Sequence, residues 1–122
     1  TGFHKIYSSN PMAAVVKYLS DHLDCALSMD NLAKIAGMSR AGFFAKFKQM
    51  YGTTPARFHL SLRLEHSKRL LRYSDETIAQ IAYQCGFEHP SHFTIAFKRE
   101  TGCAPQAYRK SIDCSAVPGD PN

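Results

Sequence analysis

The chain has no tryptophan, and its four cysteines form no Cys-x-x-Cys pair: Cys25, Cys85, Cys103 and Cys114. A structural zinc site needs four convergent ligands at characteristic spacings, and no such set is visible, so we predict no metal site and no cofactor. Cysteines spaced this widely are typical of reduced thiols rather than of a disulfide framework.

Long apolar runs are also missing. No stretch approaches the roughly 18 residues of a membrane span, and no leader-like pattern opens the chain. The sequence has no glycine-rich phosphate loop and no nucleophile elbow, so nothing favours an enzyme, although a catalytic triad assembled in space would leave no such pattern. We expect a soluble, cytoplasmic protein that is not an enzyme and contacts no membrane.

Acidic residues are scarce relative to basic ones. Ten Asp and Glu stand against fifteen Lys and Arg, which gives a net charge of +5 and a pI near 9.1. This balance favours a polyanionic partner, and a basic surface without such a partner is the alternative. With 122 residues, 44% of them hydrophobic, the chain can form one domain or two very small subdomains that share a linker.

What the chain does contain is one motif twice. The segment 32–36 (Leu-Ala-Lys-Ile-Ala) returns at 78–82 (Ile-Ala-Gln-Ile-Ala), an offset of 46 (78 minus 32). A later series recurs at an offset of 50 (93 minus 43), namely Phe43, Phe47, Lys48, Gly52, Pro55 and Phe58 as Phe93, Phe97, Lys98, Gly102, Pro105 and Tyr108. The two offsets predict four extra residues in the turn of the second copy. Two copies of a short helix, a tight turn and a second helix are typical of paired helix-turn-helix modules, which bind double-stranded DNA.

Local signals predict an all-α fold of about seven helices. Asn10 is a good N-cap, and the proline that follows it suits the first helical position. Ser39 is also a good N-cap, and it follows a turn that Gly37 begins. Thr77 and Gln80 form a capping-box pattern. We expect an N-terminal tether, a first helix-turn-helix subdomain, a linker helix, a second helix-turn-helix subdomain and a disordered tail, with bounds 1–10, 11–54, 55–73, 74–111 and 112–122.

Aromatic pairs at a spacing of four residues indicate which helix faces are buried. Phe43 with Phe47, and Phe93 with Phe97, are expected to face two small cores, and Met50 shares the first of these faces. The second helix of each module, at about 39–51 and 90–101, would then present its opposite face to a partner.

The linker helix has the length needed to separate two DNA-binding modules. Its 19 residues at ~1.5 Å each give about 28 Å, close to the roughly 34 Å between successive major-groove faces on one side of B-DNA. Basic side chains dominate it: Arg57, Arg63, Lys68, Arg69 and Arg72 stand against Glu65. Such a row could follow phosphates, and an ordinary solvated face is the alternative.

The second copy resembles the signature of the AraC/XylS family. The matching residues are Ile78-Ala79-x-Ile81-Ala82-x-x-Cys85-Gly86-Phe87, Ser91-His92-Phe93, Phe97-Lys98, Gly102, Pro105 and Tyr108-Arg109, and the similarity covers about residues 12–110. The resemblance implies two helix-turn-helix subdomains joined by a long helix, with the third and sixth helices in successive major grooves. It also implies a transcriptional regulator, usually an activator that contacts RNA polymerase.

The family's DNA-contacting positions fall on two sets of residues in this chain. The first module contributes Arg40, Ala41, Phe44, Ala45 and Lys48, and the second contributes His89, Ser91, His92, Thr94, Ile95 and Lys98. Ser39, Arg63 and Arg109 are expected to contact phosphates, which position a protein without reading sequence.

Two of these positions depart from the family's pattern. Members often carry arginine where this chain has Ala45 and Ile95, and arginine is the side chain that best pairs with guanine. We therefore expect readout by apolar contact with thymine methyls, by hydrogen bonds and by DNA deformability. Three residues keep a second interpretation: Phe44 could pack on the linker helix, His92 could support its own helix, and Arg63 could be an ion-pair partner within the fold.

The missing initiator methionine and the tether-like start indicate the C-terminal domain of a longer regulator, and a free-standing regulator is the alternative. An N-terminal domain would be a candidate site of dimerisation. Two other classes of function remain. A protein-interaction module would bind no DNA in a salt-dependent way, and a small metal- or thiol-dependent enzyme would need its reactive groups to converge in a pocket.

Overall fold

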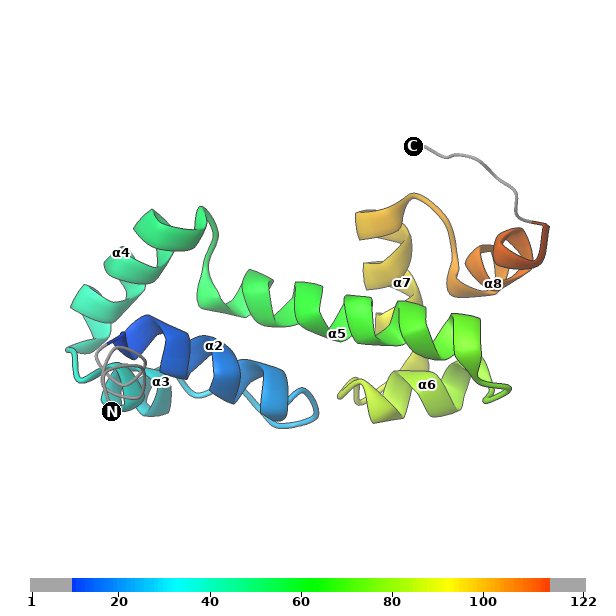
Figure 1. The fold of residues 1–122 in the computed structure, drawn as a ribbon. Coiled ribbons are helices and arrows are strands. Elements are labelled where there is room, and N and C mark those ends of the chain that lie inside the picture. Colours follow the sequence, from blue (N-terminus) through cyan, green and yellow to red (C-terminus); the bar gives the residue numbers. More distant parts are fainter. Residues whose placement is uncertain (1–9, 115–122) are drawn as a thin grey trace, which may run out of the picture. The chain divides into compact units, whose positions relative to one another are not determined.

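The computed structural model describes residues 10–114 of the chain (Figure 1). Almost all of the expected tether, 1–10, lies outside these residues. The described part contains seven α-helices and no strand, which confirms the all-α fold: α2 (Pro11–Asp21), α3 (Met29–Ala36), α4 (Arg40–Tyr51), α5 (Pro55–Tyr73), α6 (Ile78–Gln84), α7 (Pro90–Thr101) and α8 (Pro105–Cys114).

Helix ends follow local capping chemistry. Asn10, Ser28, Ser39 and Thr77 each accept a backbone N–H with the side chain, at the starts of α2, α3, α4 and α6. Such caps contribute about 1 kcal/mol each, because the first amides of a helix have no partner within it. The backbone of α8 runs to Cys114, three residues into the segment expected to be a tail, since no glycine or proline interrupts it. Residues 115–122 lie outside the described part.

The chain divides into two compact units, and the division falls inside α5. The first unit ends at Leu62 and the second begins at Arg63. Each unit therefore combines one helix-turn-helix pair with a part of α5.

The first unit buries one apolar side of α2, α3 and α4. Its core consists of Met12, Val15, Leu19, Leu32, Ala33, Ala36, Phe43 and Phe47, with Phe58 and Leu62 of α5 packed against it. Full burial of one such large side chain is worth about 1.5–3 kcal/mol. Met50 does not continue this face as expected, because its side chain is 47% exposed. Tyr51 does so instead, with its ring 4.7 Å from that of Phe47, as the i, i+4 spacing favours.

The second unit buries the corresponding positions. Its core includes Leu64, Leu71, Ile81, Ala82, Cys85, Phe93, Ala96 and Phe97. Ser67 is buried in the same place, and its hydroxyl donates to the carbonyl of Leu64 (2.6 Å), so this polar group is satisfied within α5. Burial raises the pKa of the Cys85 thiol to about 11.

The two helix-turn-helix pairs repeat in a different register from the expected one. After α3, the chain turns at Gly37 (φ 69°), and the next amide donates to the carbonyl of Ala33 (2.9 Å). After α6, it turns at Gly86 (φ 92°), and the next amide donates to the carbonyl of Ala82 (3.0 Å). A positive φ of this kind is readily adopted only by glycine. These matching contacts set an offset of 49 (86 minus 37) through the first helix and the turn.

The offset rises to 50 at Ser39 and His89, the N-caps of α4 and α7. The second turn therefore has one extra residue, and the predicted four is wrong. The buried residues follow the same register: Leu32, Ala33 and Ala36 in α3, and Ile81, Ala82 and Cys85 in α6. The sequence comparison was misleading because segment 78–82 contains Ile-Ala twice, three residues apart. Aligning it with segment 32–36 by residue identity therefore places the repeat nearly one helical turn too early.

Matching aromatic clusters close the two cores. The ring of Phe47 lies 5.8 Å from that of Phe43 and 5.4 Å from that of Phe58. In the second unit, the ring of Phe97 lies 5.6 Å from the phenylalanine one turn earlier and 5.4 Å from Tyr108. These tilted and edge-on pairs add about 0.5–1.5 kcal/mol each beyond burial. They hold α4 and α7 in the same way, so each helix turns the same positions outward.

Candidate nucleic-acid interface

The outer face of α4 carries the predicted reading residues. With Phe43 and Phe47 in the core, the residues between them and beside them point away from it, and all five predicted positions are exposed: Arg40, Ala41, Phe44, Ala45 and Lys48. The side chain of Phe44 keeps 41% of its surface exposed. The ring of Phe44 is therefore available to a partner on the outer face of α4.

The first turn of α4 is suited to a phosphate. The hydroxyl oxygen of Ser39 accepts the amide N–H of Gly42 (3.1 Å). Its own proton is then available to a phosphate oxygen, at a helix N-terminus where the dipole favours an anion. This geometry fits the expected phosphate contact of Ser39.

Arg40, in the same turn, has an intramolecular partner that the sequence did not reveal. Its Nη1 lies 3.4 Å from Oδ1 of Asp30, and both side chains are largely exposed. Exposed pairs of this kind contribute about 0–1 kcal/mol, so Arg40 can exchange the carboxylate for a phosphate at little cost.

The outer face of α7 is more polar. Ser91, His92 and Lys98 are exposed, Thr94 is half-buried, and the side chain of Ile95 is 62% exposed. The helix begins at His89, whose side chain makes no capping hydrogen bond. The rings of His89 and His92 meet edge-on, with centroids 4.9 Å apart. His92 is therefore exposed and contacts a second reading candidate rather than the core.

The offset of 50 matches α4 and α7 position by position. The four outward pairs are Ala41 with Ser91, Phe44 with Thr94, Ala45 with Ile95, and Lys48 with Lys98. Both lysines lie in the last turn of a twelve-residue helix, and the backbone carbonyl of each accepts the amide N–H of the closing glycine, at 2.8 Å in both units. The two helices thus share one basic position and differ at the other three.

Arg109 makes contacts within its own unit that the sequence did not reveal. Its guanidinium donates to three backbone carbonyls where α5 ends and α6 begins: Nε to Leu71 (3.1 Å), Nη1 to Glu76 (2.8 Å) and Nη2 to Ser74 (3.1 Å). This arrangement argues against the predicted phosphate contact, because the side chain is directed into its own unit. His59, at the matching position in the first unit, is buried and donates from Nε2 to the carbonyl of His22 (3.2 Å).

Arg63 also packs within its unit. Its guanidinium carbon lies 5.6 Å from the ring centroid of Phe87, in the turn between α6 and α7. A cation–π contact of this kind is worth about 0.5–1 kcal/mol at a partly exposed site. The structure thus gives Arg63 a packing role beside the expected phosphate contact.

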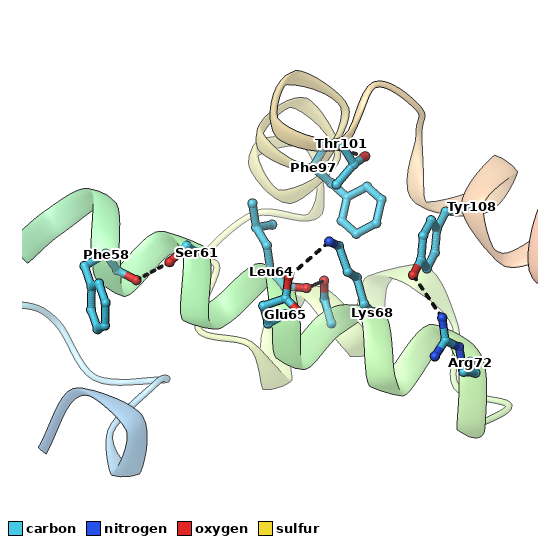
Figure 2. A network of polar contacts seen from close by, with 10 residues as sticks. Phe58, Ser61, Leu64, Glu65, Lys68, Arg72, Phe97, Thr101 and Tyr108 are labelled. Atoms are coloured by element: carbon cyan, nitrogen blue, oxygen red, sulfur yellow. Dashed lines mark hydrogen bonds and ion pairs between the residues drawn. The ribbon is translucent and has the colours of Figure 1, made fainter. Parts of the chain in front are cut away.

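Other basic side chains of α5 have partners in the second unit as well. Nζ of Lys68 lies 3.1 Å from a carboxylate oxygen of Glu65, and Arg72 donates to the hydroxyl of Tyr108 at 3.4 Å (Figure 2). These contacts favour the structural interpretation for part of the basic row on the linker helix.

A shallow apolar depression lies beside α4, and no pattern in the sequence predicted it. It holds about 680 Å³, opens to solvent, and is lined by Met29, Arg40, Ala41, Phe44, Ala45, Thr54 and Ala56. Phe44 therefore neighbours the first turn of α5 without being buried there. The starts of three helices meet the reading face here, a juxtaposition that only the fold creates.

Metal and membrane sites receive no support from the described residues. In residues 10–114, no three His, Cys, Asp or Glu side chains gather as metal ligands would. No described helix is both long and apolar enough to cross a membrane. Cys25, Cys85 and Cys103 are free thiols, and the side chain of Cys114 lies outside the described part.

Two copies of a short helix, a glycine turn and a twelve-residue helix with an exposed outer face define a double helix-turn-helix protein. Comparison with known proteins agrees with this class. A family model described as a helix-turn-helix domain matches residues 32–111. The HTH-type transcriptional activator RhaS of Escherichia fergusonii is 36% identical over 101 residues, which are 83% of this chain and 36% of that protein.

Solved structures show the same architecture. The DNA-binding domain of AdpA, a global transcriptional factor crystallised with a target DNA, is 32% identical with a TM-score of 0.81, and the match covers 90% of this chain and 99% of that domain. An AraC-type regulator from Chromobacterium violaceum is 30% identical with a TM-score of 0.80, over 92% and 97% of the two chains. The chain belongs to the AraC/XylS family of helix-turn-helix proteins, whose members are transcriptional regulators and not enzymes.

Proposed function

We propose that this chain binds double-stranded DNA at specific sequences and regulates transcription, with α4 and α7 as its two recognition helices. The observation that carries the proposal is the repeated geometry of these helices. Each has a phenylalanine pair in the core and a lysine at the same outward position, Lys48 and Lys98. A recognition helix in a major groove needs one face packed against its own domain and the opposite face exposed to the base edges.

The charge of the chain supports a nucleic-acid partner. A net charge of +5 attracts phosphates, and Ser39 and Arg40 stand at a helix N-terminus, which itself favours anions. The relative crystallised with its target DNA has the same fold over nearly its whole length. We assign base readout to the eleven predicted positions on and just before α4 and α7, and phosphate contact to Ser39, with Arg40, Lys48 and Lys98 able to serve in both ways.

We further propose that the chain acts as the DNA-binding part of a longer regulator. The chain spans 36% of the length of the RhaS relative that it matches, and that relative is an activator. Contact with RNA polymerase and dimerisation through another domain are the corresponding proposals for the complete protein. A second domain would raise the effective concentration of these recognition helices at the operator.

The test is selection from a randomised duplex library at two salt concentrations, followed by sequencing. We expect one asymmetric site with two blocks of preferred bases, bound more weakly at higher salt because phosphate contacts release counterions. Lys48→Ala and Lys98→Ala should each lower the slope of log affinity against log salt by about 0.9 if each neutralises one phosphate. Lys110→Ala, an exposed charge on α8, is the matched control.

Two results would contradict the proposal. Binding that is absent at both salt concentrations would favour a protein-interaction module. Salt-sensitive binding without any enriched sequence would leave a phosphate-binding protein that lacks specificity of its own.

A further inference from the structure

The apolar depression beside α4 lies in the first unit, next to the outward face of its recognition helix. Alanine methyls from Ala41, Ala45 and Ala56, the side chain of Met29 and the ring of Phe44 supply most of its wall. These groups are partly or fully exposed and do not belong to the core. Apolar surface of this kind costs free energy in water unless something covers it.

The position of the depression limits what can cover it. Three of its wall residues, Ala41, Phe44 and Ala45, are outward positions of α4, with Arg40 at the start of that face and Lys48 one turn beyond. The cations favour an occupant bordered by anions, whereas the wall itself favours an apolar group. In the major groove of DNA, the C5-methyl group of thymine is the apolar group on the base edges, and phosphates border the groove on both sides.

The matching positions on α7 have a different chemistry. Ser91 and Thr94 place hydroxyl groups where α4 has Ala41 and Phe44. Hydroxyl groups donate to and accept from base edges, which a methyl or phenyl group cannot do. The two units therefore differ in the base property that they can recognise.

We propose that the depression on α4 receives thymine methyl groups, so that the first unit recognises its block of the site by thymines and the second unit recognises its block mainly by hydrogen bonds. This inference rests on the proposed DNA-binding function. It predicts an asymmetric site whose two blocks differ in preferred bases. Ala41 and Phe44 determine the preference of the first block, and Ser91 and Thr94 that of the second.

The experiment uses duplexes of the selected sequence in which single thymines are replaced by deoxyuridine. This replacement removes only the C5-methyl group and leaves the hydrogen-bonding edges intact. Each thymine that enters the depression should cost about fourfold in affinity when its methyl is removed, the value for one fully buried methyl-sized group. In the block bound by α7, at most a thymine facing Ile95 should respond.

A pair of variants assigns the effect to this site. Phe44→Thr copies the residue of the second unit, and because the side chain is exposed, the fold should persist, which circular dichroism can check. With this variant, the ratio of the affinities for thymine and deoxyuridine duplexes should fall towards one for thymines in the first block and stay unchanged for those in the second. Ile95→Thr is the matched control and should leave the first block unchanged.

The outcomes separate this inference from the function on which it rests. If no sequence is enriched, the proposed function itself fails. If a site is enriched but deoxyuridine costs nothing in the first block, or costs the same with and without Phe44, the DNA-binding function stands and the thymine pocket is overturned. Self-association that Phe44→Thr abolishes would assign the depression to a second copy of the chain and would also overturn the inference.

Discussion

Replacing Arg109 by alanine separates a structural role from a phosphate contact at one residue. Its guanidinium satisfies carbonyl oxygens of Leu71, Ser74 and Glu76 at 2.8–3.1 Å, and these acceptors are 33 to 38 residues away in sequence. At a net value of about 1 kcal/mol for each hydrogen bond, the loss in free energy of unfolding should be about 3 kcal/mol. That is a large part of the stability of so small a domain.

Urea denaturation of the Arg109→Ala variant measures this loss, and DNA binding at several salt concentrations measures its charge effect. We expect a lower urea concentration at the denaturation midpoint. For the protein that remains folded, the slope of log affinity against log salt should not change. Lys110→Ala, on the same helix, should change the midpoint little. Arg109→Lys should not restore stability, because one ammonium group cannot reproduce the planar fork that spans three carbonyls. An unchanged midpoint with a slope lower by about 0.9 would refute this reasoning and restore the phosphate contact.

Three further predictions concern single groups. Asp30→Asn removes the partner of Arg40 and one negative charge near α4, so it should strengthen DNA binding about twofold to fourfold at low salt; Asp21→Asn, which breaks an exposed pair on α2, is the control, and an equal effect there would contradict the local explanation. The pKa of the Cys85 thiol is raised from 9.0 to about 11, so its contribution to stability is complete below pH 9 and is lost as the pH rises through 11; the unfolding free energy of Cys85→Ala should depend less steeply on pH across that range, and a parallel curve would count against it. Ser39→Ala should lower the free energy of unfolding of the first unit by about 1 kcal/mol, measured by thermal denaturation, and a larger loss of DNA affinity than of stability would indicate the expected phosphate contact.

The helices themselves were accessible from sequence because their signals are local. Asn10, Ser39 and Thr77 cap helices within three residues of themselves, and the phenylalanine pairs mark a buried face within one turn. The range expected for the linker helix, 55–73, is the range of α5, because proline fixes where such a helix starts and no breaker interrupts it. The exposed reading faces on α4 and α7 follow from the same periodicity, although which bases they bind is still a prediction.

The register of the repeat and the roles of several charged residues were decided only by tertiary structure. Matching identical residues aligned segment 78–82 with the first copy almost one helical turn too early. The buried positions and the hydrogen bonds of the two turns give the correct alignment. The partners of Arg109 lie more than thirty residues away, and no local pattern connects them. The depression beside α4 likewise needs Met29, Phe44 and Ala56 from three helices in one place. Helix capping and hydrophobic periodicity depend on a few consecutive residues. The contacts of Arg109 and the depression beside α4 form only after chain segments far apart in sequence have packed together.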